Sequence, residues 1–545
     1  MTEPPQPPNQ PPSPSGYGHL PGPPQQGYGY PPQGANPYAQ QPPTVPQPLA
    51  QHGGYGFPPG PGMPPGPPAP GGPGRRKGAV VVAAAVAGVL VLGTGAYFAF
   101  LSGDDGSKTP VAQGSTPADP KPSGSPSVDK GDGSGNGGAE QTDLNAGRKP
   151  GEDKVMWFKT AKLTGPGAGI PTQGQWVVGD TVVKTIDKSV VGYAVTDGKE
   201  KWKIDVRAEI CGLTDQTTAE GKTVIVVKDG GGSNADCNQM KLIDLKAGKE
   251  GWTKPVDKEN LFDGGGVDVG LALTGDTVAV NRMAATSAYR VSTGEKLFSG
   301  SGPEGCQPSQ YAAGNGKMLG IALCMDADKT IEVQDADPVT GKKTWSYRLP
   351  KGWRVTGVYS VSPIVLDIGN RETKERAVIA LTPDGKKRSS MAAEGNFQVN
   401  CGAGSSDNLQ GCGASAVDGD TLYLNTLTDK GTNNEVVAFD LATGKAKWRR
   451  AAGDQRMFHP LKAANGQLTV YRAGLRDEPG EILSVPAAGG EPKTLLRMPS
   501  GPAAKVEGSF LSNGRRAFED GRFITSAASL TGNGQDERLL MVFGK

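Results

Sequence analysis

The sequence predicts an all-β fold, an eight-bladed β-propeller that occupies residues 151–545. Three observations predict it. A hairpin phrase recurs at intervals of about one blade, a second hairpin phrase lies between its copies, and segments at the two ends of the domain can pair as strands. A propeller blade is a four-stranded antiparallel sheet of about 40–50 residues, so two hairpins in each repeat supply one blade.

The first hairpin phrase is clearest in VVAFDLATGKAKW, residues 436–448, where strand-forming residues flank a Thr-Gly-Lys turn. Glycine favours such turns because it adopts a positive φ at little cost. The corresponding turns carry the glycines Gly198, Gly248, Gly294, Gly341, Gly385, Gly444 and Gly490, which follow one another at steps of 44 to 59 residues. This spacing is that of one blade.

The second hairpin phrase alternates with the first, as in WVVGDTVVKT from Trp176. Further copies begin at Ala219, Ala272, Ala313, Ala416, Ala463 and Phe518, and VSPIVLDIGN from Val361 takes the remaining place without a glycine turn. Both hairpin turns of each unit are predicted to be tight. Each unit therefore holds four strands.

Ring closure is predicted from the two ends of the domain. KVMWFKTAKL, residues 154–163, carries a Trp about one period before Trp202, whereas ERLLMVFGK ends the chain where a partner strand should follow. Pairing of these segments would complete an eighth blade and remove a free sheet edge.

The recurring phrase resembles the repeats of the pyrroloquinoline-quinone-like propellers over about residues 154–545. That family includes quinoprotein alcohol dehydrogenases, bacterial assembly scaffolds of the BamB kind and sensor ectodomains of some receptor kinases. The resemblance implies the fold and leaves the function open, because propellers carry unrelated activities. Trp202, Trp252, Trp345 and Trp448 fall at the same point of their repeats, which indicates packing between blades.

A quinone cofactor is the specific expectation that this resemblance raises. Dehydrogenases of the family place a disulfide between adjacent cysteines against the quinone and hold Ca²⁺ with loop carboxylates and an Asn. This sequence has no Cys-Cys dipeptide and no matching ligand set. We therefore expect no cofactor.

The segments before the propeller predict a membrane anchor. Residues 1–74, rich in Pro, Gly, Gln and Tyr, predict a disordered tail. Residues 75–101 predict a transmembrane helix with a basic flank, because 78–101 are uncharged and long enough to cross a bilayer. Residues 102–150 predict a flexible linker.

The charges beside the predicted span set its orientation. Arg75, Arg76 and Lys77 precede it, and Asp104 and Asp105 follow. The positive-inside bias places the tail in the cytoplasm and the propeller outside the plasma membrane of a bacterium.

Cysteine usage agrees with an extracytoplasmic domain, because all six cysteines follow the predicted span and their number is even. Six cysteines allow fifteen pairings. The predicted strands favour the sequential pairs, since two pairs each flank a hairpin and the third shares one long loop: Cys211 with Cys237, Cys306 with Cys324, and Cys401 with Cys412. Buried free thiols are the alternative.

The functional prediction is based on the lengths of the loops that connect the predicted strands. The two tight turns of each unit share one face of a propeller, and the longer loops, such as 228–239, 254–270 and 392–415, emerge on the other. The predicted disulfides brace that long-loop side. Braced loops on a rigid scaffold favour a binding surface, and the alternative is that the cystines only replace packing.

Catalytic and metal-binding candidates are few. Only His459 of three histidines lies in the folded domain, where MFHP after a strand indicates packing or a solvated loop. The pairs Asp326 with Asp328 and Asp335 with Asp337 lack the Gly-centred loop and distal Glu of an EF-hand calcium site, and indicate strand-end and turn carboxylates. No catalytic, cofactor or metal residue is assigned, although paired carboxylates on distant loops stay possible.

The net charge of the chain and the composition of its N-terminal tail limit the kinds of partner that the sequence predicts. A net charge of +2 gives no broad basic surface, so nucleic acid is not expected. The Pro-rich tail either recruits a cytoplasmic partner that reads polyproline or acts as a spacer.

The sequence thus favours a membrane-anchored, non-enzymatic module that binds, scaffolds or senses a protein or cell-envelope ligand on its long-loop face. The alternative is a membrane-tethered oxidoreductase that uses pyrroloquinoline quinone in a divergent site. Signalling through the tail is a variant of the first hypothesis, and it would need a separate partner because no kinase signature is present.

Overall fold

The computed structural model describes residues 143–165, 169–231, 235–259, 269–282, 285–300, 305–397, 401, 408–427, 433–475 and 478–545. The predicted tail, the predicted span with Arg75, Arg76 and Lys77, and most of the predicted linker lie outside these residues. Within them, none of the helices has the length and apolar character that crossing a membrane requires.

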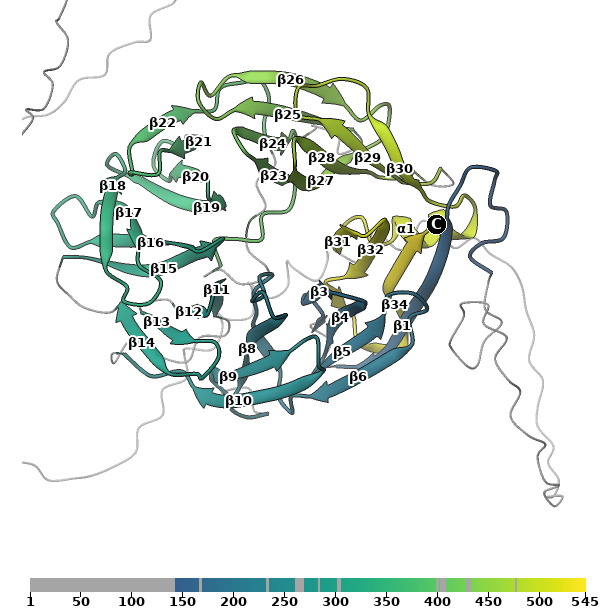
Figure 1. Cartoon of the computed structure of the whole chain (residues 1–545), viewed down its shortest axis with the longest axis horizontal. Helices are drawn as coiled ribbons and strands as arrows, with labels where there is room; N and C mark the ends of the chain where they lie inside the picture. The colour runs from purple at the N-terminus through teal and green to yellow at the C-terminus, as the bar shows by residue number, and fades with distance from the viewer. Residues whose placement is uncertain are drawn as a thin grey trace, which may run out of the picture. The chain divides into compact units, whose positions relative to one another are not determined.

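Eight four-stranded antiparallel sheets form the fold, as predicted. They stand around a ring, with the first strand of each sheet nearest the centre and the last at the outside (Figure 1). We number these blades from 1 to 8 in chain order.

Blades 1 to 4 each use four consecutive strands. Blade 1 holds β3 (Gln175–Val178), β4 (Thr181–Ile186), β5 (Ser189–Ala194) and β6 (Glu200–Asp205). Blade 2 holds β7 (Ile210–Gly212), β8 (Lys222–Lys228), β9 (Cys237–Asp244) and β10 (Lys249–Pro255). Blade 3 holds β11 (Gly270–Thr274), β12 (Thr277–Asn281), β13 (Thr286–Arg290) and β14 (Lys296–Gly300). Blade 4 holds β15 (Cys306–Gly314), β16 (Lys317–Cys324), β17 (Ile331–Ala336) and β18 (Lys343–Arg348).

Blades 5 to 7 follow the same plan. Blade 5 holds β19 (Trp353–Val361), β20 (Ile364–Asn370), β21 (Arg376–Leu381) and β22 (Lys387–Ser390). Blade 6 holds β23 (Ser415–Asp418), β24 (Thr421–Asn425), β25 (Glu435–Asp440) and β26 (Ala446–Ala451). Blade 7 holds β27 (Phe458–Ala464), β28 (Gln467–Arg472), β29 (Glu481–Pro486) and β30 (Lys493–Arg497).

Blade 8 closes the ring with strands from both ends of the domain. It holds β31 (Gly514–Glu519), β32 (Arg522–Ala527), β34 (Asn533–Gly544) and β1 (Lys154–Thr164), and it follows the short helix α1 (Pro502–Gly508). Strands β1 and β34 pair antiparallel from Lys154 opposite Gly544 to Thr164 opposite Asn533. The predicted closure is therefore confirmed. Two short strands, β2 (Ile170–Pro171) and β33 (Ser529–Leu530), add a small pairing beside it.

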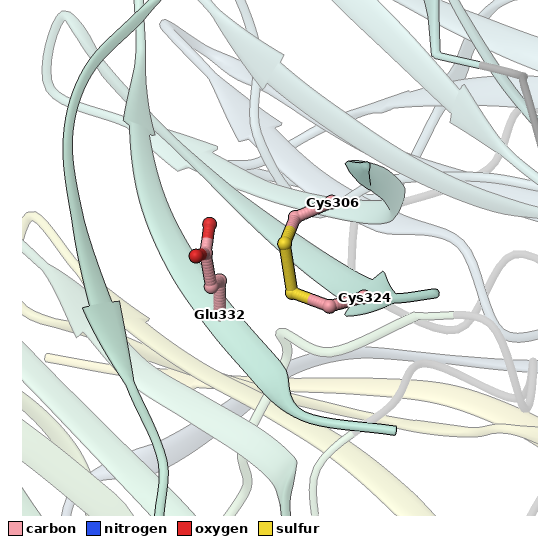
Figure 2. A group of neighbouring side chains, drawn as sticks. All are labelled: Cys306, Cys324 and Glu332. Carbon is pink, nitrogen blue, oxygen red and sulfur yellow. A yellow bond between two sulfur atoms is a disulfide. The ribbon is translucent and has the colours of Figure 1, made fainter. Parts of the chain in front are cut away.

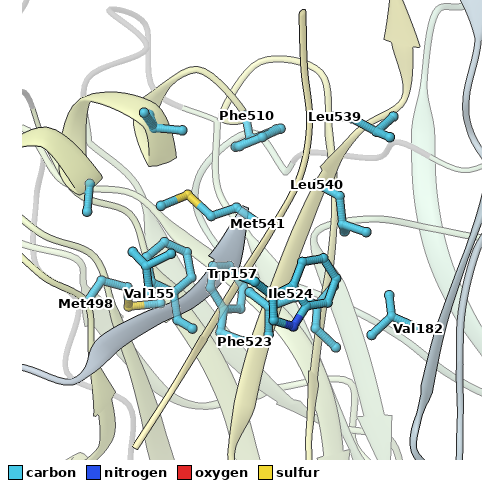
Figure 3. Packing of buried hydrophobic residues seen from close by; sticks show 14 of the residues in the cluster. Val155, Trp157, Val182, Met498, Phe510, Phe523, Ile524, Leu539, Leu540 and Met541 are labelled. Atoms are coloured by element: carbon cyan, nitrogen blue, oxygen red, sulfur yellow. The ribbon is translucent and has the colours of Figure 1, made fainter. Parts of the chain in front are cut away.

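The hydrophobic core is divided among the boundaries between blades. Second strands such as β4 and β12 are almost wholly buried, because a neighbouring blade covers each face. At the closure, Val155 and Trp157 of β1 share a buried cluster with Phe523 of β32 and Met541 of β34 (Figure 3). Closing the ring therefore buries large apolar side chains as well as pairing a strand.

One aromatic side chain on the outer strand of a blade packs against a turn glycine of the next blade. A Cβ added at these glycines would lie within 3 Å of the facing ring, so no larger residue fits. The pairs are Trp157 with Gly198, Trp202 with Gly248, Trp252 with Gly294, Phe298 with Gly341, Trp345 with Gly385, and Trp448 with Gly489. The predicted role of the tryptophans in blade packing is confirmed, although the last glycine is Gly489 rather than Gly490, because that turn is displaced by one residue.

The predicted tightness of every hairpin turn is wrong in one blade. Seven blades join their first two strands through two residues, but residues 213–221 separate β7 from β8. The predicted difference in loop length between the two faces is also not found in every blade. Residues 187–188 and 206–209 are short connections on the face that was predicted to carry the long loops. The contrast is thus confined to particular blades.

Candidate functional site

Antiparallel strands place two kinds of loop on each end of the ring. Connections after the second and fourth strands of a blade leave from one end, which we call the long-loop face. Turns after the first and third strands leave from the other end, the short-turn face. The three longest connections, 391–414, 498–513 with α1, and 256–269, all belong to the long-loop face.

Two disulfides lie at strand ends of the long-loop face, and the third lies within a connection of that face and packs against the middle of β19. Cys211 at the start of β7 is bonded to Cys237 at the start of β9, and Cys306 at the start of β15 is bonded to Cys324 at the end of β16. Cys401 and Cys412 are bonded within the connection 391–414. The short-turn face carries none among the described residues, so covalent bracing is specific to one end of the ring.

The connection between blades 5 and 6 folds back onto inner strands. The Gln410 side chain donates to the carbonyl of Ala313 at 2.8 Å and accepts from its amide at 2.7 Å, while Val358 donates to Leu409 O at 2.8 Å. Gly357 of β19 leaves room for the Cys401 sulfur, since a Cβ there would lie 2.5 Å from it. The connection is therefore fixed to blades 4 and 5 by hydrogen bonds and close packing.

Exposed large apolar side chains gather on the same face. Among the described residues they are Leu323, Met325, Leu427 and Val339, with exposed fractions of 45%, 54%, 54% and 49%. Leu323 and Met325 flank Cys324 at the end of β16, and Leu427 follows β24. Val339 alone lies in a turn of the short-turn face. Exposed apolar residues that a rigid scaffold holds in place are suited to protein contacts.

Three potential metal ligands meet beside β15, β16 and β17, but they do not form a metal site. Sulfurs of Cys306 and Cys324 and a carboxylate oxygen of Glu332 lie within 4.8 Å of one another (Figure 2). The sulfurs are bonded to each other and offer no thiolate. Glu332 instead accepts from Gln334 at 3.0 Å, Lys343 at 3.2 Å and Arg348 at 3.0 Å, and these hydrogen bonds outweigh burial and lower its pKa.

The predicted carboxylates play the structural parts expected of them. Asp337 accepts from the amides of Val339 and Thr340 and so shapes the turn before β18. Asp326 accepts from the Thr330 amide at 2.9 Å. Asp335 accepts from the Thr344 hydroxyl at 2.7 Å, and Asp328 pairs with Lys351 at 2.6 Å.

His459 lies inside β27, not after a strand as predicted. It stacks on Tyr471 with ring centroids 5.8 Å apart, and its buried Nε2 has no hydrogen-bond partner in the described part of the chain. Burial and the nearby Arg516 charge lower its pKa to about 3, so the imidazole stays neutral. Packing, one of the two interpretations from sequence, describes it.

A buried polar cluster that sequence reasoning missed lies between blades 7 and 8. Tyr471 donates to Glu507 at 2.5 Å, and the Gly480 amide donates to the same carboxyl at 3.2 Å. Arg516 donates to the carbonyls of Phe510 and Leu511 at 2.9 and 2.7 Å. Burial raises the pKa of Glu507 to about 7, partly offset by these hydrogen bonds and by arginine charges. The cluster ties α1 to blade 7.

A fully buried lysine is the second feature that the sequence did not reveal. Lys184 of β4 donates to the carbonyl of Thr172, and its pKa is well below the usual range because of burial and the charge of Arg515. No sequence pattern distinguished it, because an isolated Lys in a strand is ordinarily exposed.

The described residues do not fit a pyrroloquinoline quinone site. Each disulfide joins residues at least 11 positions apart, so none presents the adjacent-cysteine pair. In the described ranges, the one cluster of three potential ligands is the disulfide with Glu332, which offers no Ca²⁺ set.

No protein-family model matches the sequence, and no curated protein matches it. Solved structures with similarity include BamB from Moraxella catarrhalis, at 14% identity and a TM-score of 0.40, covering 71% of this chain and 100% of that chain. A europium-containing methanol dehydrogenase is 13% identical with a TM-score of 0.42, covering 72% of this chain and 93% of that one. A quinohemoprotein alcohol dehydrogenase from Pseudomonas putida is 11% identical with a TM-score of 0.40, covering 72% and 76%.

These similar structures include a protein named BamB and two dehydrogenases, so they do not separate binding from oxidation. The fold is assigned from the eight four-stranded blades, from the closure of the ring by β1 and β34, and from the contacts between neighbouring blades. The described chain is an eight-bladed β-propeller consistent with the pyrroloquinoline-quinone-like repeat type.

Proposed function

We propose that this protein is a non-enzymatic binding and scaffolding module whose long-loop face engages a protein of the cell envelope. The observation that supports this most is that all three disulfides brace the face on which Leu323, Met325 and Leu427 are exposed. A rigid surface loses little conformational entropy on binding, and exposed apolar side chains gain from desolvation.

The proposal includes a membrane anchor. Residues 78–101 cross the plasma membrane, and the propeller lies outside. Three disulfides support an oxidising compartment for the propeller. Protease treatment of intact spheroplasts tests this topology: the propeller is expected to be digested while residues 1–74 survive, and the reverse would contradict it.

The binding experiment uses Val339 as a matched control. The partner is first captured by chemical crosslinking in cells, and its affinity is then measured for the parent protein and for two variants of the full chain. Leu323→Asp with Met325→Asp should weaken binding by at least tenfold, because charge replaces apolar contact at the braced face. Val339→Asp, on the short-turn face, should leave the affinity within twofold. Equal effects of both changes would sink the assignment of the face.

Shortening the connection 402–411 between Cys401 and Cys412 is a further test of the surface. Partner capture should fall while thermal unfolding stays cooperative, because the described part of this segment, residues 408–411, belongs to no strand of a blade. Unchanged capture would remove this loop from the binding surface.

The oxidoreductase alternative is tested separately. A native mass spectrum after incubation with pyrroloquinoline quinone and Ca²⁺ should show no stoichiometric retention of the quinone. Retention, followed by dye reduction with an alcohol or sugar, would replace the binding proposal with the dehydrogenase one.

A further inference from the structure

The boundary between blades 3 and 4 departs from the repeat at two positions. Phe298 stands where Trp157, Trp202, Trp252, Trp345 and Trp448 pack against the next blade. Two residues later, on the same side of the strand, the five boundaries with these tryptophans have Lys159, Ile204, Lys254, Tyr347 and Arg450, whereas this one has Gly300. Less side-chain volume is therefore available at this boundary than at those five.

The inner part of the same boundary is also built from small residues. Its buried cluster contains four alanines, Ala272, Ala279, Ala313 and Ala336, beside Tyr311 and Met318. At the boundary between blades 1 and 2, the places of Ala272, Ala279 and Ala336 instead hold the larger residues Trp176, Val183 and Ile243. Small side chains therefore line this boundary from both blade 3 and blade 4.

A cavity of about 350 Å³ lies at this boundary. Its walls include Phe298 and Gly300 of blade 3, and Pro308, Tyr311, Gln334 and Lys343 of blade 4. Cys306 also lines it, so the disulfide to Cys324 braces one wall. This volume lies within the range of small-molecule sites, near its lower limit.

The cavity walls combine aromatic rings with oriented polar groups. Phe298 and Tyr311 meet edge to face, with ring centroids 5.9 Å apart. The Gln334 amide donates to Cys306 O at 2.9 Å and to Glu332 at 3.0 Å. Its nitrogen is thereby held in place, and its oxygen accepts no hydrogen bond from the described part of the chain.

Charge at the cavity favours a neutral ligand. Lys343, the charged residue of the lining, donates to Glu332 at 3.2 Å, and the carboxylate offsets its charge. The ammonium keeps further N–H donors for a ligand. An anion would compete with Glu332, and a cation would face Lys343.

We propose that this cavity binds one or two units of a neutral saccharide. A sugar ring presents an apolar C–H face to an aromatic side chain and hydroxyl groups to amide and ammonium groups. Phe298 and Tyr311 supply the first kind of contact, and Gln334 and Lys343 supply the second. The residues that line the site do not include the exposed apolar residues of the long-loop face, and the proposal does not depend on the function proposed there.

The decisive variant fills the cavity with the residue that other boundaries carry. Saturation-transfer NMR is recorded on the full-length protein in a detergent without a sugar headgroup. The probes are glucose, galactose, mannose, N-acetylglucosamine, cellobiose and chitobiose at concentrations on the order of 10 mM, which detects millimolar dissociation constants. At least one probe should give ring-proton signals with the parent protein. Phe298→Trp should reduce them at least tenfold and retain cooperative unfolding.

Two further variants keep the test specific. Trp448→Phe alters the boundary between blades 6 and 7 and should leave the signals within twofold. Lys343→Ser removes an ammonium whose side chain is 44% exposed, and should weaken the bound saccharide at least threefold without unfolding the protein. Absence of signal for all six probes, or equal signals with Phe298→Trp, would overturn the proposal. Loss of long-loop partner binding would leave this result unchanged.

Discussion

The Glu507 side chain is almost completely buried, with an exposed fraction of 2%. It accepts hydrogen bonds from Tyr471 and Gly480, but the cost of burying a charge dominates and raises its pKa to about 7. In the folded protein this group therefore holds its proton to higher pH than in the unfolded chain. Titration of the Glu507 carboxyl group therefore makes the stability of the protein depend on pH.

Replacing Glu507 by Gln should remove that dependence. Since the pKa rises from 4.5 to about 7 on folding, its contribution to stability is undiminished below pH 4.5 and falls as pH rises to about 7, by roughly 3 kcal/mol. Chemical denaturation between pH 4.5 and 8 should show this loss in the parent protein and not in Glu507→Gln. Glu491→Gln, at a side chain 93% exposed, should behave like the parent. A parent protein whose stability rises over this interval would contradict the assignment.

Single residues show where sequence reasoning succeeded and where it stopped. The tryptophans were predictable because their register repeats, and Phe298 occupies the same register, so its substitution was visible in the sequence. Glu507 lies in α1, Tyr471 in blade 7 and Arg516 in blade 8, at positions that do not repeat. Their meeting depends on how α1 packs, which no periodic pattern records.

The Trp–Gly contact is the element that joins one blade to the next. Trp252 donates from its indole to Val291 O at 2.9 Å, and Trp157, Trp345 and Trp448 make the equivalent bond at 2.8 to 3.0 Å. Trp202 packs against Gly248 in the same way, but its buried indole N–H has no partner among the described residues. The chain therefore offers a comparison of the contact with and without its hydrogen bond.

Trp252→Phe should destabilise the propeller more than Trp202→Phe. Both lose one ring of the indole, at about 1–3 kcal/mol, but only Trp252→Phe also loses a satisfied hydrogen bond. The difference in the free energy of unfolding should be about 1–2 kcal/mol. Equal losses in the free energy of unfolding would show that the indole hydrogen bond contributes nothing to the stability of the Trp–Gly contact.

Element positions were predictable where phrases repeated, and less so in the connections. The glycine turns located nearly every hairpin, but β7 contains only Ile210–Gly212 and leaves residues 213–221 outside the sheet. The placement of His459 within β27 shows the same limit, because MFHP is not part of either repeated hairpin phrase and Pro is uncommon inside strands.

The whole molecule depends on closure between β1 and β34. A free β34 would expose an unpaired edge and the apolar side chains that now face Val155 and Trp157. Closure was predictable because one Trp occurred a period too early and the last hairpin lacked a strand. The binding face was only partly predictable, since loop length and cysteine positions are local, but exposure of Leu323, Met325 and Leu427 depends on neighbouring blades.

Removal of β1 tests this dependence. A chain of residues 165–545 should lose more than ~5 kcal/mol relative to residues 143–545, because Val155 and Trp157 leave the core and an edge opens. Thermal unfolding and size-exclusion chromatography should show a lower transition temperature and association between chains. Equal stability and a monomeric profile would contradict closure by β1.

The measurement that tests the central claim most directly is photocrosslinking from single positions of the full-length protein in its own cells. A photoreactive residue at Met325 or Leu427 reports the long-loop face, and the same residue at Val339 reports the short-turn face at similar exposure. A binding module of the proposed kind gives a discrete adduct from Met325 or Leu427 and none from Val339. Adducts from Val339 alone, or from none of the three positions, would contradict a binding role for the braced face.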